Sequence, residues 1–157
     1  MFNSEPKKPA EPVPPPVLKP TAAPKGRVLL ADDDAVVRRA LGLKLSAAGY
    51  QVLNAEDGAQ AVSIARKEKP DVIILDINFP PEPGVMWDGF RLMQWLHRPS
   101  ETMRIPVIII TGEQSAKHRD TALAAGAAGF FHKPVDNQSL IAVVEKLIGA
   151  ASEPPKA

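Results

Sequence analysis

Two stretches of the chain, residues 72–75 (VIIL) and 107–110 (VIII), are aliphatic at every position. A strand with one face in water alternates apolar and polar residues, so an unbroken apolar run predicts a strand that is covered on both faces. Shorter β-branched and aliphatic stretches occur at Arg27–Ala31, Gln51–Ala55 and Gly129–His132. The pattern therefore predicts five strands, and the two fully apolar ones are expected near the centre of a parallel sheet.

Between these stretches, apolar residues recur at the spacing of an α-helix. The predicted helices cover about residues 35–48, 58–68, 88–97, 115–125 and 137–149. Gly49 and Gly126 stand where two helices should stop, and Asp136 is placed to cap the start of the last helix. Regular alternation of strands and helices predicts an α/β fold with a doubly wound, open parallel sheet of (βα)5 type.

The ends of the chain differ in composition from this alternating region. Residues 1–25 contain eight of the 17 prolines and few large apolar residues. Such a segment cannot bury enough surface to offset its ordering entropy, so we expect a disordered tail or linker. The expected organisation is this tail, a folded domain over residues 26–150 and a disordered end over residues 151–157.

Charge and cysteine content narrow the possible partners. The net charge of +1 gives no general attraction to nucleic acid or to anionic lipid. The absence of cysteine excludes disulfides and thiolate metal sites, and no apolar run approaches the roughly 20 residues that span a bilayer. We therefore expect a cytoplasmic protein with neither a nucleic acid nor a membrane as its partner.

Polar residues follow four of the five predicted strands. Asp32, Asp33 and Asp34 follow the first strand, Asp76 the third, Thr111 the fourth and Lys133 the fifth. Each is ordinary by itself, because Asp commonly caps helices and forms turns, and Asp34 is expected to do so. Glu56 and Asp57, after the second strand, are also interpreted as turn residues. Together, however, these groups should meet, because open parallel sheets carry functional groups at the carboxyl ends of their strands.

Such a meeting has an electrostatic consequence. Two carboxylates about 4 Å apart repel by about 4 kcal/mol at an effective dielectric constant near 20. A lysine and a divalent cation would offset this repulsion, and Mg²⁺ prefers carboxylates, backbone carbonyls and water as ligands. Neither G-x-G-x-x-G nor G-x-x-x-x-G-K-[ST] occurs in the chain, which disfavours nucleotide binding.

Four motifs in this order, VLLADDD, DVIILD, PVIIITG and AGFFHKP, resemble the receiver domain of two-component response regulators. The resemblance covers about residues 26–150. It implies a CheY-like, flavodoxin-like fold with strand order 2-1-3-4-5 and a switch point between the first and third strands.

The resemblance also implies a phosphorelay function. Asp76 would accept a phosphoryl group from a sensor histidine kinase or a phosphotransfer protein. Mg²⁺ (or Mn²⁺) would be held by Asp32, Asp33, Asp76 and the backbone carbonyl of Asn78. The domain would assist its own phosphorylation and dephosphorylation without being an enzyme in the usual sense.

Further residues gain roles from the same resemblance. Lys133 and Thr111 would contact the phosphoryl oxygens, and the Lys133–Pro134 bond would be cis. Phe130 would be the switch aromatic that responds to Thr111. The downstream protein target would bind helix four, strand five and helix five.

Two loop residues and one insertion complete the comparison with the family. Asn78 and Glu113 would tune the lifetime of the phosphorylated state. Residues 81–87 form an insertion of about five residues relative to receivers in general, and its role stays open. Arg38 and Arg39 are expected on a solvated face of the first helix, which often belongs to the kinase-binding surface in this family.

Several alternatives remain. After Gly149 only eight residues follow, so a single-domain regulator without an output domain is favoured, although a receiver excised from a larger hybrid kinase or regulator is also possible. A receiver-like module that only docks is disfavoured by the intact acidic residues. A phosphatase of the haloacid dehalogenase type needs D-x-D-x-[TV], and the second acid of that motif is missing after Asp76.

Overall fold

The computed structural model describes residues 24–77, 89–97, 105–112 and 116–152. Five parallel strands form one sheet in the order β2-β1-β3-β4-β5. The strands are β1 Arg27–Ala31, β2 Gln51–Ala55, β3 Val72–Asp76, β4 Val107–Thr111 and β5 Gly129–His132, and the helices are α1 Ala35–Ala47, α2 Gly58–Glu68, α3 Gly89–Leu96, α4 Ala116–Ala124 and α5 Asn137–Ser152. The predicted doubly wound α/β fold and its strand order are confirmed.

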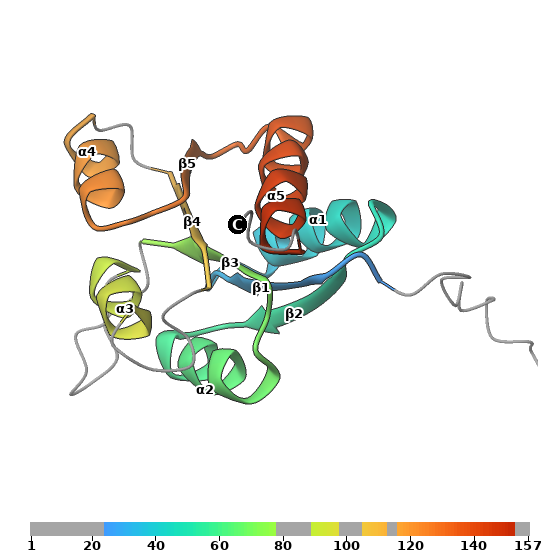
Figure 1. The fold of residues 1–157 in the computed structure, drawn as a ribbon. Helices are drawn as coiled ribbons and strands as arrows, with labels where there is room; N and C mark the ends of the chain where they lie inside the picture. Colours follow the sequence, from blue (N-terminus) through green and yellow to red (C-terminus); the bar gives the residue numbers. More distant parts are fainter. Residues whose placement is uncertain (1–23, 78–88, 98–104, 113–115, 153–157) are drawn as a thin grey trace, which may run out of the picture.

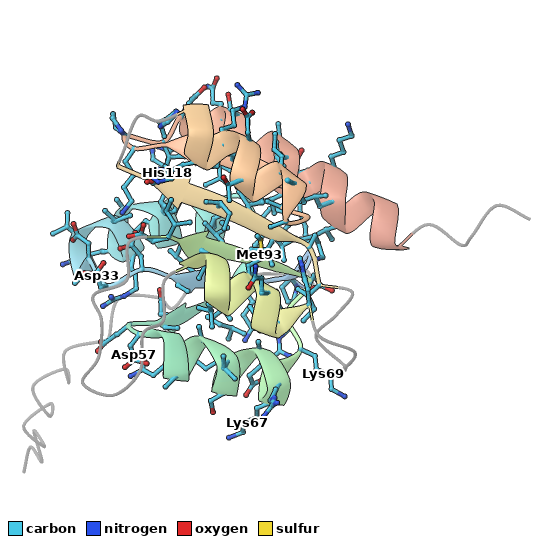
Figure 2. All side chains as sticks on the ribbon, turned by 90° about the vertical axis from the view of Figure 1, so that its left-hand side faces the viewer. Asp33, Asp57, Lys67, Lys69, Met93 and His118 are labelled. Atoms are coloured by element: carbon cyan, nitrogen blue, oxygen red, sulfur yellow. The ribbon has the colours of Figure 1, made fainter. Side chains whose placement is uncertain are left out.

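The helices cover both faces of the sheet (Figure 1). On one face, α1 and α5 bury side chains such as Leu41 and Val144 against the sheet. On the other face, α2, α3 and α4 contribute a second cluster that includes Met93 (Figure 2). Every residue of β3 and β4 is buried, as their unbroken apolar runs predict for central strands.

Helix ends follow the expected local chemistry. Asp34 caps α1, where its carboxylate accepts a hydrogen bond of 2.8 Å from the backbone nitrogen of Val36. Asp57 caps α2 in the same way. Gly49 and Gly126 adopt φ angles of 101° and 98° after α1 and α4, a region in which a side chain is strained.

Three elements extend beyond their sequence-based boundaries. Strands β3 and β4 each extend one residue further, because Asp76 pairs with Ile110 and Thr111 pairs with His132 in the parallel ladders. Helix α5 continues to Ser152 rather than ending at 149, since alanine has the highest helix propensity of all residues.

At the amino-terminal end, the backbone nitrogen of Lys25 donates to the carbonyl of Gly49 at 2.9 Å, next to the start of β1. Residues 1–23 and 153–157 of the two predicted disordered ends lie outside the described residues. Among the helices of the described ranges, none has the length and apolar character that crossing a bilayer requires.

The buried faces of the sheet predict where substitutions are costly. Leu29 in β1 is fully buried, whereas Leu43 in α1 is 64% exposed. We expect Leu29→Ala to lower the free energy of unfolding by about 3 kcal/mol, because it removes buried methyl groups and leaves a cavity. Leu43→Ala removes the same atoms from a solvent-exposed surface and should change the free energy of unfolding by less than about 0.5 kcal/mol. Urea unfolding followed by circular dichroism measures both, and equal effects would contradict the assigned burial.

Candidate metal and phosphorylation site

Three aspartates meet at the carboxyl edge of the sheet. Asp32 and Asp33 follow β1, and Asp76 is the last residue of the neighbouring strand β3. One carboxylate oxygen from each lies within 4.8 Å of those from the other two. Asp32 and Asp76 are buried and Asp33 is exposed (Figure 2), so the cluster opens to solvent on one side.

Lys133 bridges the two buried carboxylates. Its Nζ lies 2.8 Å from Oδ2 of Asp32 and 3.0 Å from Oδ2 of Asp76. Its backbone nitrogen donates to the carbonyl of Thr111 at 2.7 Å, and the Lys133–Pro134 peptide bond is cis. Burial lowers the pKa of Lys133, but its contacts with Asp32 and Asp76 outweigh this effect and raise the pKa above its usual value. The side chain is therefore an ammonium ion at neutral pH.

The donor set fits a hard divalent cation. Three carboxylates face the single ammonium group of Lys133, so acidic groups outnumber the basic group that bridges them. Oδ2 of Asp32 is buried, and among the described residues it accepts no hydrogen bond of good geometry beyond its ion pair with Lys133. Closely spaced carboxylate oxygens with an open side are the ligands that Mg²⁺ or Mn²⁺ takes, with water completing the shell. The chain can therefore hold such an ion at Asp32, Asp33 and Asp76.

Thr111 lies at the end of β4, next to the strand that carries Asp76, and Phe130 lies on β5, one strand further away. Thr111 is fully buried at the end of β4, one position beyond the partner of Asp76. Phe130 is half-buried and packs against the core cluster formed with α2, α3 and α4. Its ring meets the ring of His132 edge-on, with 5.2 Å between centroids. The structure thus brings Thr111 to the strand end beside Asp76, whereas Phe130 lies on the next strand. Asn78, Glu113 and the insertion at 81–87 lie outside the described residues.

Arg38 departs from the sequence-based expectation. It was expected on a solvated face of the first helix, but its side chain is only 13% exposed, whereas the neighbouring Arg39 is exposed. The Arg38 guanidinium donates a 2.6 Å hydrogen bond to the backbone carbonyl of Asp32. The signal for this was present, because Arg38 precedes the buried Leu41 and Leu45 by three and seven residues and so shares their face of α1.

This fold and this acidic site together define a CheY-like receiver domain. The model of the response regulator receiver domain family matches residues 28–145, and the chain belongs to this family. It is 35% identical over 122 residues to Protein PilH of Pseudomonas aeruginosa, covering 78% of this chain and 97% of that protein. The structure of the chemotaxis response regulator CheY4 of Vibrio cholerae is similar, with a TM-score of 0.68 and 30% identity over 77% of this chain and 97% of that one.

Longer regulators match the same region. The chain is 37% identical over 121 residues to the response regulator PleD of Caulobacter vibrioides, which covers 77% of this chain and 26% of that protein. It also spans 48% of the probable transcriptional regulator ycf27 of Porphyridium aerugineum. The receiver is therefore the part that this chain shares with these relatives.

The acidic cluster predicts that metal binding stabilises the fold. At about 100 times its dissociation constant, Mg²⁺ should raise the free energy of unfolding by about 2.7 kcal/mol if it binds only the folded chain. Asp33→Asn should lose most of this gain, whereas Asp57→Asn, which keeps a good helix cap outside the cluster, should retain it. Thermal unfolding with and without Mg²⁺ measures the effect. No stabilisation of the wild type, or equal stabilisation of Asp33→Asn, would contradict the site.

The lysine bridge predicts a coupling between Lys133 and Asp76. Lys133→Met should lower the free energy of unfolding by about 2 kcal/mol, less than for a fully buried pair because Lys133 is partly exposed. The double variant Lys133→Met/Asp76→Asn should be more stable than Lys133→Met alone, since one unpaired carboxylate is gone. Urea unfolding of both variants, with Lys146→Met on the exposed side of α5 as control, tests this. Strictly additive effects would argue against the bridge.

Proposed function

We propose that Asp76 is the phosphoacceptor of this receiver domain and that Mg²⁺ (or Mn²⁺) is its cofactor. The observation that carries the proposal is the position of the Asp76 carboxylate. Asp76 is the last residue of a central strand and is 2% exposed. Its carboxylate lies 3.0 Å from the Lys133 ammonium group, with the carboxylates of Asp32 and Asp33 nearby. A nucleophile held on a rigid strand between a cation and a metal site is positioned for phosphoryl transfer.

The reaction follows from these positions. One Asp76 oxygen forms a bond to phosphorus while the bond from phosphorus to the imidazole nitrogen of a phosphohistidine breaks, and the electron pair stays with the imidazole. Asp32, Asp33 and Asp76 would hold the metal ion, and the backbone carbonyl of Asn78 is proposed as a further ligand. A bound Mg²⁺ supplies neutralisation of the charge on the phosphoryl oxygens. Lys133 holds a second positive charge against the same oxygens.

The acyl phosphate formed in this way is a temporary signal. Thr111 and Lys133 would contact the new phosphoryl oxygens, and Phe130 would respond when Thr111 moves. The added charge biases an equilibrium between two arrangements rather than building a new fold. Hydrolysis returns the carboxylate, and we propose that Asn78 and Glu113 set its rate.

The domain itself is a signalling module, and its partners are proposed from this role. A sensor histidine kinase or phosphotransfer protein would donate the phosphoryl group in the cytoplasm. A protein target would bind the surface of α4, β5 and α5, which carries the exposed Leu123. We propose residues 26–150 as the receiver and residues 1–25 and 151–157 as flanking segments, either of a single-domain regulator or within a longer protein.

A small phosphodonor tests the proposed acceptor directly. After incubation with acetyl phosphate and Mg²⁺, intact mass spectrometry should show one added phosphoryl group on the wild type. Asp76→Asn should show none, because an amide cannot form the acyl phosphate, and removal of Mg²⁺ with EDTA should abolish labelling.

The matched control for this experiment is Asp57→Asn, which changes an acid at the same edge of the sheet but outside the cluster (Figure 2). It should be labelled like the wild type. An unlabelled wild type, or undiminished labelling of Asp76→Asn, would refute the proposed acceptor.

A further inference from the structure

We propose that Arg38 is a positioning residue of the metal site, which holds the backbone between Asp32 and Asp33 so that both carboxylates face the ion. This inference rests on the proposed binding of Mg²⁺ at the acidic cluster. It concerns a residue that touches neither the ion nor the phosphoryl group, and that acts through the peptide unit joining two of the proposed ligands.

The contact is short and shielded. Nη1 of Arg38 lies 2.6 Å from the carbonyl oxygen of Asp32, and the Arg38 side chain is 13% exposed. Nη2 lies 3.5 Å from Oε1 of Glu56, which follows β2. The guanidinium group therefore links the carboxyl ends of β1 and β2, two neighbouring strands of the sheet.

The direction of the carbonyl that Arg38 holds affects the positions of both Asp32 and Asp33. The peptide unit is planar, so the direction of the Asp32 carbonyl fixes the plane that carries the nitrogen and Cα of Asp33. The nitrogen of Asp32 is held by the carbonyl of Ala55 at 3.2 Å, and Oδ1 of Asp32 accepts from the nitrogen of Asp34 at 2.8 Å. Together with the bond from Arg38 to the carbonyl, hydrogen bonds hold the backbone nitrogen, the backbone carbonyl and the side chain of Asp32.

Arg38 is itself anchored on the sheet side of α1. Its backbone nitrogen donates to the carbonyl of Asp34 at 3.0 Å within the first turn. From there the side chain extends back to the carbonyl of Asp32, so Arg38 connects the first turn of α1 to the segment that carries Asp32 and Asp33. Residues that orient metal ligands in this way typically contribute 10-fold to 100-fold to metal affinity.

Positioning and simple charge predict opposite effects of removing Arg38. A guanidinium near the site repels a divalent cation, so on charge alone its removal should strengthen Mg²⁺ binding. If Arg38 acts by orienting Asp32 and Asp33, its removal should weaken binding. Arg39, the next residue, is exposed and carries the same charge, and it serves as the matched control.

The test is isothermal titration calorimetry, in which the whole chain is titrated with Mg²⁺ alone. We expect Arg38→Gln to bind Mg²⁺ about 10-fold more weakly than the wild type. Arg39→Gln should bind as tightly as the wild type or slightly more tightly. Arg38→Lys keeps the charge but lacks the planar, two-pronged donor, so it should remain weaker than the wild type.

A second readout separates binding from chemistry. With acetyl phosphate, the Mg²⁺ concentration for half-maximal labelling of Arg38→Gln should rise about 10-fold, while the rate at saturating Mg²⁺ stays near that of the wild type. Unchanged or tighter Mg²⁺ binding by Arg38→Gln, including the case in which only its thermal stability falls, would overturn the inference. If the wild type binds no Mg²⁺, the proposed metal site itself is wrong.

Discussion

The carboxyl edge of the sheet gathers acidic groups whose mutual repulsion must be offset. Three carboxylates converge there, and two of them are buried. A close pair of this kind repels by about 4 kcal/mol at an effective dielectric constant near 20, and a domain of this size is stable by only about 5–15 kcal/mol. Lys133 offsets part of the repulsion through ion pairs with Asp32 and Asp76. The remaining negative charge is what suits the site to a divalent cation.

The parallel sheet makes this concentration of charge possible. Strands β1 and β3 are neighbours although α1, β2 and α2 separate them in the sequence, and their carboxyl ends deliver Asp32 and Asp76 to one point. Because β3 and β4 are buried at every position, Asp76 stands on a backbone held by strand pairing and by packing on both faces of the sheet. A carboxylate at the end of such a strand is held more rigidly than one in an exposed loop.

The two basic residues at the acidic cluster make different kinds of contact. Lys133 supplies positive charge directly to the carboxylates, whereas Arg38 supplies a planar donor to the backbone that carries them. Thr111 on β4 pairs with His132 on the edge strand β5, and the ring of His132 contacts the ring of Phe130. A site built in this manner can couple a local change in charge to a protein surface some distance away.

The strands, the helices and their alternation could be predicted from the sequence, because a fully apolar run and a helical repeat are local patterns that burial imposes directly. It also placed Asp32, Asp33, Asp76, Thr111 and Lys133 at strand ends, since the motifs around them are contiguous. Only the tertiary structure decided the contacts between distant segments. The bridge from Lys133 to both buried carboxylates and the inward turn of Arg38, unlike the exposed Arg39, depend on how α1 and β5 pack against the sheet. Hydrogen bonds and ion pairs require a few tenths of an ångström of positional accuracy, and packing sets that accuracy, whereas sequence spacing does not.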